Sequence, residues 1–500
     1  MQNYEIAFNI WHICCMTITM SNLDILKVAL RKLRHYYYYE KNDLITRTEV
    51  LTFEEDSLLF VAEIIEEPSK AKVFLDKISI NIYPKSIIPK NEEIKPSKNK
   101  NVFSNEHLAS GGKIQEFLKM AYMPVELHLI SVVWLMAYGK ILDNELSTNA
   151  LGNRLDDIGQ GLENINPNRK IFKNYLSQYN LWWRNAITAC KDQLDGKRDV
   201  TMINFDIKSF YNNVDFDFEE IETFINSKLG GYKTIENDPI HKILKQIHSK
   251  YRSVYYDAQG KAKERKKLTI LPIGLLTSFV LANWYLKDID KKILDLDPIL
   301  YGRYVDDFII VFQGKSFSDF NNADDVIKHK LERIISIKSK ENEYEFLDRQ
   351  SLKLKWEKTF IYKFSHKYPP SLLDKFIDDQ KSRSSEFRFL SDEEDENFED
   401  FDKVTFEQNF NLDEGNKARF KVIEENKFKM SAYFAKLISR RISNGDGYKE
   451  DEIDKIYQFF KGYYLLKNYQ FWEKIFAVFI IYEKYEHLNK LINEVRNEIE

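Results

Sequence analysis

Residues Tyr301–Phe312 read Tyr-Gly-Arg-Tyr-Val-Asp-Asp-Phe-Ile-Ile-Val-Phe and place two adjacent aspartates between two apolar runs. The aromatic and β-branched residues on both sides favour strands. Asp306 and Asp307 disfavour a strand interior and favour the turn between the two strands. The stretch therefore predicts a β-hairpin that carries two carboxylates at its tip, beside a buried sheet.

Neighbouring carboxylates such as this pair repel each other unless they are protonated or neutralised. A bound divalent cation removes that cost, and Mg²⁺ takes carboxylate oxygens as ligands. A pair of adjacent aspartates that stands alone is more often a solvated turn. The choice between a metal site and a plain turn therefore depends on the rest of the chain.

Three further features accompany the aspartate pair. Val200–Phe205 predicts a buried strand that ends at Asp206, where a carboxylate either caps the next turn or belongs to a site. Leu271-Pro272-Ile273-Gly274 forms a turn that enters a helix, whose N-terminus offers free N–H groups. Ser351–Phe364 includes an alternating, strand-like run that contains Lys358.

These features together suit two-metal phosphoryl transfer. That chemistry needs carboxylates from different elements that converge on two cations about 3.5–4 Å apart. Asp206, Asp306 and Asp307 are the candidate ligands of two Mg²⁺ ions. A lysine such as Lys358 can offset developing charge on a triphosphate or donate a proton to it. The candidate catalytic residues are therefore the three aspartates and Lys358.

Four short motifs occur in one order along the chain: Asp206-x-x-x-x-Tyr211, Leu271-Pro272-x-Gly274-x-x-x-Ser278-x-x-Leu281-x-Asn283, Tyr304-Val305-Asp306-Asp307 and Lys358-Thr359. They resemble motifs A, B, C and D of the reverse transcriptase palm. The third motif alone is moderately specific, and all four in order are highly specific. The resemblance implies an α+β right-hand polymerase with fingers and palm.

The resemblance also assigns roles to single residues. Asp206 and Asp306 match the acids that bind both metals, and Asp307 matches a neighbouring acid that is less strictly required. Tyr211 matches the steric gate that crowds a ribose 2′-hydroxyl and so favours dNTPs over NTPs. Lys358 matches the lysine near the incoming triphosphate.

Other roles concern nucleotide binding. Gly274 and Ser278, with Pro272, are expected to line the nascent base pair. Arg154 is the candidate phosphate ligand of the fingers, with Arg169 and Lys170 as alternatives. The expected partners are dNTPs and nucleic acid, either an RNA template or a non-coding RNA, together with the DNA product.

Ile273 stands where reverse transcriptases of retrons and group II introns usually have glutamine. This relaxed motif, a divergent N-terminus and a helical C-terminal region resemble bacterial abortive-infection (AbiK-like) and defence-associated reverse transcriptases. Members of that group protect bacteria against phage. Some of them make DNA without an ordinary template, and some prime from a tyrosine of the protein. The rival within the family is a templated enzyme of a retron or group II intron, bound to a non-coding RNA.

Four successive tyrosines are candidates for such priming: Tyr36, Tyr37, Tyr38 and Tyr39. A surface on which bases stack, or a partly buried edge of a strand or helix, are the alternatives. Two rivals from other classes remain. An RNA-dependent RNA polymerase is opposed by Tyr211, and an inactive nucleic-acid-binding protein is opposed by the three aspartates.

The chain has 500 residues, of which 43% are hydrophobic and 30% charged, with a net charge of -4. This length allows several domains with real cores. The three cysteines include no Cys-x-x-Cys spacing, which fits a reducing cytosol and argues against a zinc site. The first 20 residues lack Lys and Arg and are too polar to span a bilayer. We expect a cytoplasmic protein without membrane segments, in which residues 1–19 are an extension or an artefact of the assumed start.

Composition changes along the chain predict five parts: an N-terminal extension (1–105), fingers (106–199), palm (200–365), an acidic linker (366–415) and a C-terminal helical domain of αα-repeat type (416–500). Ser21–Leu33 predicts an amphipathic helix, and Ile114–Leu142 predicts a helix broken at Pro124. The lysine-rich stretch Tyr251–Thr269 is either a solvated hairpin or a loop that contacts phosphates. Residues from Arg419 onward are expected to be helical throughout, and their apolar faces suggest a homo-oligomer.

Overall fold

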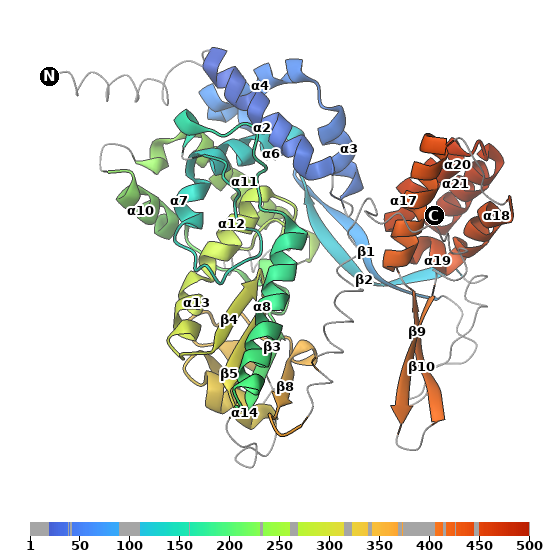
Figure 1. Cartoon of the computed structure of the whole chain (residues 1–500). Helices are drawn as coiled ribbons and strands as arrows, with labels where there is room; N and C mark the ends of the chain where they lie inside the picture. Colours follow the sequence, from blue (N-terminus) through green and yellow to red (C-terminus); the bar gives the residue numbers. More distant parts are fainter. Residues whose placement is uncertain are drawn as a thin grey trace. The chain divides into compact units, whose positions relative to one another are not determined.

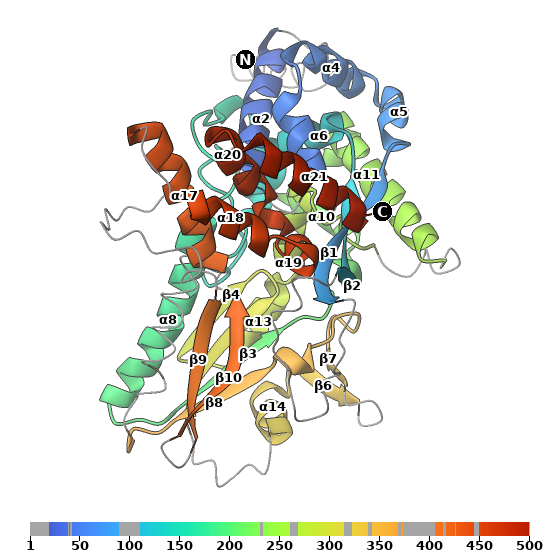
Figure 2. The ribbon, with the colours of Figure 1, turned by 90° about the vertical axis from the view of Figure 1, so that its right-hand side faces the viewer.

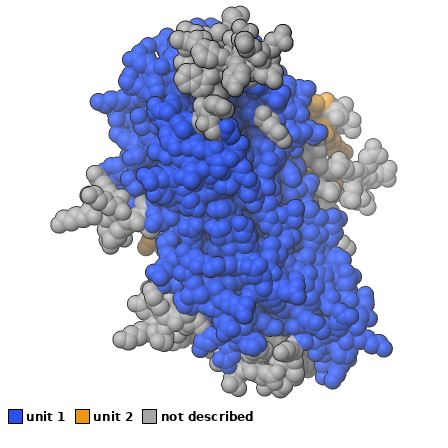
Figure 3. Space-filling model, turned by 90° about the vertical axis from the view of Figure 1, so that its left-hand side faces the viewer, with its two compact units in different colours: residues 1–81, 119–373 blue, residues 82–118, 374–500 orange. Residues whose placement is uncertain are grey.

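The computed structural model describes residues 20–38, 40, 43–89, 111–159, 161–230, 234–260, 269–314, 323–338, 343–368, 373, 406–413, 417–425, 427–444 and 450–499. The chain divides into two compact units, which Figure 3 colours blue and orange. Unit 1 takes residues 1–81 and 119–373, and unit 2 takes residues 82–118 and 374–500.

Unit 1 contains a four-stranded antiparallel sheet in the order β4-β5-β3-β8 (Figure 1). The strands are β3 (Val200–Asp206), β4 (Leu300–Tyr304), β5 (Asp307–Gln313) and β8 (Phe360–Phe364). β3 and β5 are buried along almost their whole length, which explains why both read as continuous apolar runs. The predicted hairpin around the aspartate pair is confirmed as β4 and β5. A smaller hairpin pairs β6 (Ile335–Lys338) with β7 (Glu343–Phe346).

Helices make up most of the remainder of unit 1: α2 (Met20–Tyr38), α3 (Leu44–Thr52), α4 (Leu58–Glu66), α5 (Lys72–Leu75), α6 (Val125–Trp134), α7 (Lys140–Asp143), α8 (Tyr175–Asp195), α9 (Phe210–Asn213), α10 (Phe218–Lys228), α11 (Pro239–Ala258), α12 (Leu276–Tyr285), α13 (Lys287–Leu294) and α14 (Ala323–Leu331). Short 3₁₀ turns lie at Glu55–Ser57, Pro68–Ala71, Leu162–Asn164, Ile235–Asn237 and Trp356–Lys358. The predicted helix at Ser21–Leu33 is confirmed, and it extends to Tyr38.

A long apolar helical run of unit 1 leads from α6 through a π-helical turn (Leu135–Gly139) into α7. In the described part of the chain, Val125–Asp143 is the one helix long and apolar enough to cross a membrane, by length and composition only. That run is 72% buried and contacts α2, α11 and α12. A helix buried in the core of a protein also meets these criteria of length and composition.

The prediction of a helix across Ile114–Leu142 is wrong for its first part. Residues Gly112–Tyr122 form strand β2, which pairs with β1 (Ser79–Pro89) in a two-stranded sheet. Short apolar runs fit either secondary structure, and here a partner strand decides between them.

Unit 2 contains a helical core and a hairpin. The helices are α17 (Lys427–Asn444), α18 (Glu450–Phe459), α19 (Gly462–Lys467), α20 (Trp472–Ile481) and α21 (Tyr485–Ile499), with a 3₁₀ turn at Tyr469–Phe471. Their buried apolar side chains form one cluster around Phe434, Phe460 and Phe479. The hairpin pairs β9 (Phe406–Asp413) with β10 (Lys417–Glu425) (Figure 2). The expectation of helix from Arg419 onward is therefore wrong up to Glu425, and the acidic stretch 391–402 lies outside the described residues.

Candidate active site

The first carboxylate of the site is set by the pairing of two central strands. Asp206 is the last residue of β3 and lies opposite Asp307, the first residue of β5. The backbone continues this pairing past the strand ends, because Ile207 N donates to Asp306 O at 3.2 Å. On its other side, Asp206 O accepts a hydrogen bond from Lys355 N at 2.8 Å. The fold thus brings the three predicted aspartates to one edge of the sheet.

The aspartates influence one another strongly. Burial is the largest of the effects that raise the pKa of Asp306 to about 7, and the charges of Asp307 and Asp206 contribute to the same shift. Burial and Asp206 raise the pKa of Asp307 to about 6, against an opposing effect of Lys358. The side chains of Asp206 and Asp306 are within hydrogen-bonding reach of each other. Such a concentration of carboxyl groups is stabilised by added positive charge.

This donor set fits Mg²⁺, which prefers carboxylate oxygens and is held by one or two carboxylates together with substrate phosphates. Within the described residues, no group of three or more His, Cys, Asp or Glu side chains is gathered as closely as a bound ion requires. The approach of Asp206 to Asp306, and its register with Asp307, are therefore the observations that bear on metal binding.

Lys358 joins the site from the 3₁₀ turn at Trp356–Lys358, which precedes β8. Its Nζ lies 3.0 Å from Asp206 Oδ2, and the hydrogen bond to Asp206 raises the pKa of Lys358. The lysine side chain is 56% exposed, so it can also reach a substrate in solution. Its contact with a triphosphate stays a prediction.

Tyr211, the predicted gate, lies on the short helix α9, which follows β3 after one turn. Its backbone oxygen accepts a hydrogen bond from Leu271 N at 2.8 Å, which joins the first motif to the second. Burial raises the pKa of Tyr211, and the nearby charge of Asp306 raises this pKa further. A hydrogen bond with Asn153 opposes that shift. The structure therefore places the gate candidate beside the carboxylates.

The second motif forms a turn before α12. Gly274 has φ +106°, a conformation that L side chains rarely adopt, and Ile273 O accepts a hydrogen bond from Ala121 N at 2.8 Å. Gly274 is half-buried, whereas Ser278 is fully buried and its Oγ has no hydrogen-bond partner in the described part of the chain. The roles of Gly274 and Ser278 beside the nascent pair stay predictions.

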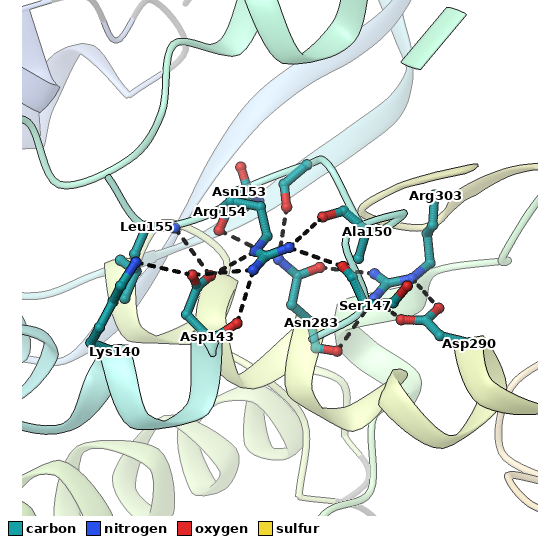
Figure 4. A network of polar contacts seen from close by, with 11 residues as sticks. Lys140, Asp143, Ser147, Ala150, Asn153, Arg154, Leu155, Asn283, Asp290 and Arg303 are labelled. Atoms are coloured by element: carbon teal, nitrogen blue, oxygen red, sulfur yellow. Dashed lines mark hydrogen bonds and ion pairs between the residues drawn. The ribbon is translucent and has the colours of Figure 1, made fainter. Parts of the chain in front are cut away.

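Arg154 is engaged inside the protein (Figure 4). Its Nε lies 2.9 Å from Asp143 Oδ1, and the guanidinium also donates to the backbone oxygens of Asp143, Ser147 and Ala150. A second contact with the Asp143 carboxylate, at 3.4 Å, involves its remaining N–H. In this conformation Arg154 fixes the loop that follows α7. Its contact with substrate phosphates stays a prediction.

A neighbouring network, centred on Arg303, was not singled out from the sequence. Arg303 is fully buried and forms an ion pair with Asp290, with Nε 2.7 Å from Oδ1. It also donates to Asn283 Oδ1 at 2.8 Å and to Val305 O at 2.9 Å. Asn283 in turn donates to Gly152 O at 2.7 Å, which joins this network to the Arg154 loop (Figure 4). The signal in the sequence was a lone arginine within an apolar strand, because a buried charge needs a partner.

The four candidate priming tyrosines differ in their surroundings. Tyr37 is fully buried, and its hydroxyl donates to Gly274 O at 3.3 Å. Tyr36 is partly buried among other rings, whereas Tyr38 is 53% exposed. Tyr39 lies outside the described residues, as do the lysines of 261–268. Priming by any of these tyrosines stays a prediction.

The comparison with protein families bears on the whole arrangement. A family model described as "Reverse transcriptase (RNA-dependent DNA polymerase)" matches residues 147–391. The match spans all four motifs, the sheet that carries the aspartates, and the turn that holds Lys358. It indicates a polymerase palm and fingers. A search of the curated proteins found no match.

Proposed function

We propose that Asp206, Asp306 and Asp307 carry out nucleotidyl transfer with two Mg²⁺ ions. The chain contains a reverse transcriptase domain and is thus an RNA-directed DNA polymerase, a nucleotidyltransferase. The observation that carries this proposal is the register of β3 and β5, which sets Asp206 opposite Asp307 and beside Asp306. Asp206 and Asp307 end and begin the two central strands, and Asp306 lies in the turn before β5, so three acids come from separate elements to one end of the sheet, an arrangement of the kind that two-metal transfer uses.

Each side chain has a stated task in this mechanism. Asp206 and Asp306 would hold the two ions, and Asp307 would add negative charge to the site. Two Mg²⁺ ions, when bound, activate the attacking hydroxyl and stabilise the leaving pyrophosphate. Lys358 offers positive charge or a proton to the pyrophosphate oxygens. Tyr211 occupies the space that a ribose 2′-hydroxyl would need, and so favours dNTPs.

The test is incorporation of a labelled dNTP by the purified chain with Mg²⁺. Asp306→Asn preserves the shape of the side chain and removes its charge, so we expect a loss of about 10³-fold or more in kcat, comparable to the removal of a central catalytic group. The matched control is Asp195→Asn, which changes an exposed aspartate at the end of α8. Equal activity of the Asp306→Asn variant and the wild type would reject the proposed site.

For the biological role, we propose that the enzyme acts in bacterial antiphage defence. The support is the resemblance to the abortive-infection group in three sequence features: Ile273 in the second motif, a divergent N-terminal region and a helical C-terminal region. The templated enzyme of a retron or group II intron is the alternative.

The defence role predicts that cells carrying the wild-type chain reduce phage plating by at least tenfold, whereas cells carrying Asp306→Ala do not. A panel of unrelated phages is needed, with equal protein levels confirmed by immunoblot. In vitro, product that stays attached to protein until protease digestion supports priming from a tyrosine. Free DNA that is made only when RNA survives nuclease treatment supports the templated alternative.

A further inference from the structure

The N-terminal helix α2 contacts three separate parts of unit 1: the 166–169 loop, the turn of the second motif, and the rings of Phe172 and Phe279. Lys32 on α2 is buried, and its Nζ lies 2.8 Å from Asn166 O and 2.5 Å from Arg169 O. One turn later, the hydroxyl of Tyr37 donates to Gly274 O in the second motif. The helix therefore holds the 166–169 loop and the motif turn at a fixed spacing.

Tyr36 lies between those two contacts and belongs to a cluster of four rings, the gate cluster: Tyr36, Phe172, Tyr211 and Phe279. The ring of Tyr36 lies 6.1 Å from that of Phe172 and 6.3 Å from that of Phe279. Phe279 lies 5.7 Å from Phe172 and meets Tyr211 edge-on at 6.2 Å. Phe279 thus contacts the gate candidate directly, whereas Tyr36 and Phe172 contact Phe279 from two other chain segments.

A plain hydrophobic core is the competing explanation, because all four residues pack against the main core of unit 1, but their partial exposure opposes it. All four members of the gate cluster are only partly buried. Their direct neighbours in sequence, Tyr37, Phe210 and Val280, are almost completely buried. The cluster therefore reaches the surface of unit 1, at the place where Tyr211 approaches Asp306.

We propose that Tyr36, Phe172 and Phe279 form the wall behind the gate, and that Tyr36 is a specificity-determining residue that keeps the Tyr211 ring from yielding to a ribose 2′-hydroxyl. This inference rests on the proposed function, because it takes Tyr211 as the gate. A side chain excludes a substituent only if it cannot move away, and edge-on contacts between rings resist that movement. Tyr36 acts through its ring and thus needs no reactive hydroxyl.

The experiment compares kcat/KM for a dNTP with kcat/KM for the matching NTP. We expect Tyr36→Ala to lower this ratio by roughly 3- to 10-fold, the worth of one or two aromatic contacts. Tyr36→Phe keeps the ring and is expected to keep the ratio. Tyr36→Ala in a Tyr211→Ala background is expected to change nothing more. The control is Phe60→Ala, which removes a ring that is 61% exposed on α4.

The outcomes separate this inference from its premise. If Tyr36→Ala leaves the ratio unchanged while Tyr211→Ala lowers it, the supporting role of Tyr36 is rejected and the gate role of Tyr211 is kept. If Tyr211→Ala leaves the ratio unchanged, both the gate role of Tyr211 and the supporting role of Tyr36 are rejected. Loss of protein-linked product in Tyr36→Phe assigns priming to Tyr36 and contradicts the role of its ring alone. If circular dichroism shows that the Tyr36→Ala variant does not fold, Phe172→Leu provides the same test from another chain segment.

Discussion

Val305 has φ +57°, a left-handed backbone conformation that β-branched residues rarely adopt. Strain of this kind costs on the order of 1–3 kcal/mol and persists only where the surroundings enforce it. Here Arg303 donates to Val305 O, and Gly152 packs so closely that a Cβ on it would meet Val305 N at 2.6 Å. The strained residue directly precedes Asp306, so its conformation sets the direction of that carboxylate.

A second feature at the scale of residues is a histidine in an apolar setting. His248 on α11 lies among the rings of Phe216 and Phe218, and burial lowers its pKa to about 3. The unfolded chain binds a proton at this residue near pH 6.5. Its contribution to stability is therefore complete above pH 6.5 and is lost as the pH falls from 6.5 towards 3.

We predict that His248→Phe removes this contribution, because phenylalanine keeps a ring of similar shape and does not titrate. Between pH 6.5 and pH 5, the wild type should lose about 2 kcal/mol more unfolding free energy than the variant does, at about 1.4 kcal/mol per pH unit. Urea unfolding at the two pH values measures this difference. The exposed His329, replaced in the same way, is the control. Equal losses in the wild type and His248→Phe would contradict the prediction.

At the scale of elements, the Arg303 network connects β4, α12 and α13 behind the catalytic turn. Arg303 and Asp290 are both almost completely buried, and Tyr301 also donates to Asp290, at 2.5 Å. Removal of one partner of a buried ion pair leaves the other charge without compensation, which costs about 3–5 kcal/mol. Replacement of both partners by apolar side chains costs far less.

We therefore predict that Arg303→Met lowers the free energy of unfolding by about 3–5 kcal/mol, and that adding Asp290→Leu recovers part of this loss. The double variant still lacks the donor to Val305 O, so we expect its dNTP incorporation to stay low. Denaturant midpoints and incorporation assays on the same samples separate the two effects. If the double variant regained wild-type activity, Arg303 would have no role in positioning the turn.

The elements differ in how far sequence alone predicted them. The hairpin of β4 and β5 was predictable because a polar pair interrupts two runs of aromatic and β-branched residues. Strand β2 was not, because its residues suit a helix as well as a strand and its partner β1 lies in another segment. The Arg303 pair was missed for a related reason: Asp290 lies on a different element, the helix α13, and carries no local sign of its partner.

At the scale of the molecule, the residues of the candidate site that lie in the four motifs were predictable from the sequence. The structure brings Asp206, Asp306, Tyr211 and Lys358 together, although these residues span a long stretch of sequence. The contribution of α2 was not predictable, because helical periodicity shows which face is buried and not what covers it. The resemblance to reverse transcriptases gave no information about this helix.

Each of the two units is assembled from two separate stretches of chain, because residues 82–118 of unit 2 lie within the sequence of unit 1. During translation, residues 82–118 therefore emerge from the ribosome long before residues 374–500. At usual rates of synthesis, the delay between the two stretches is on the order of tens of seconds. Unit 1 can close during translation, but unit 2 can be completed only when the last helices emerge. The order of synthesis thus allows unit 1, which carries the polymerase site, to fold before unit 2.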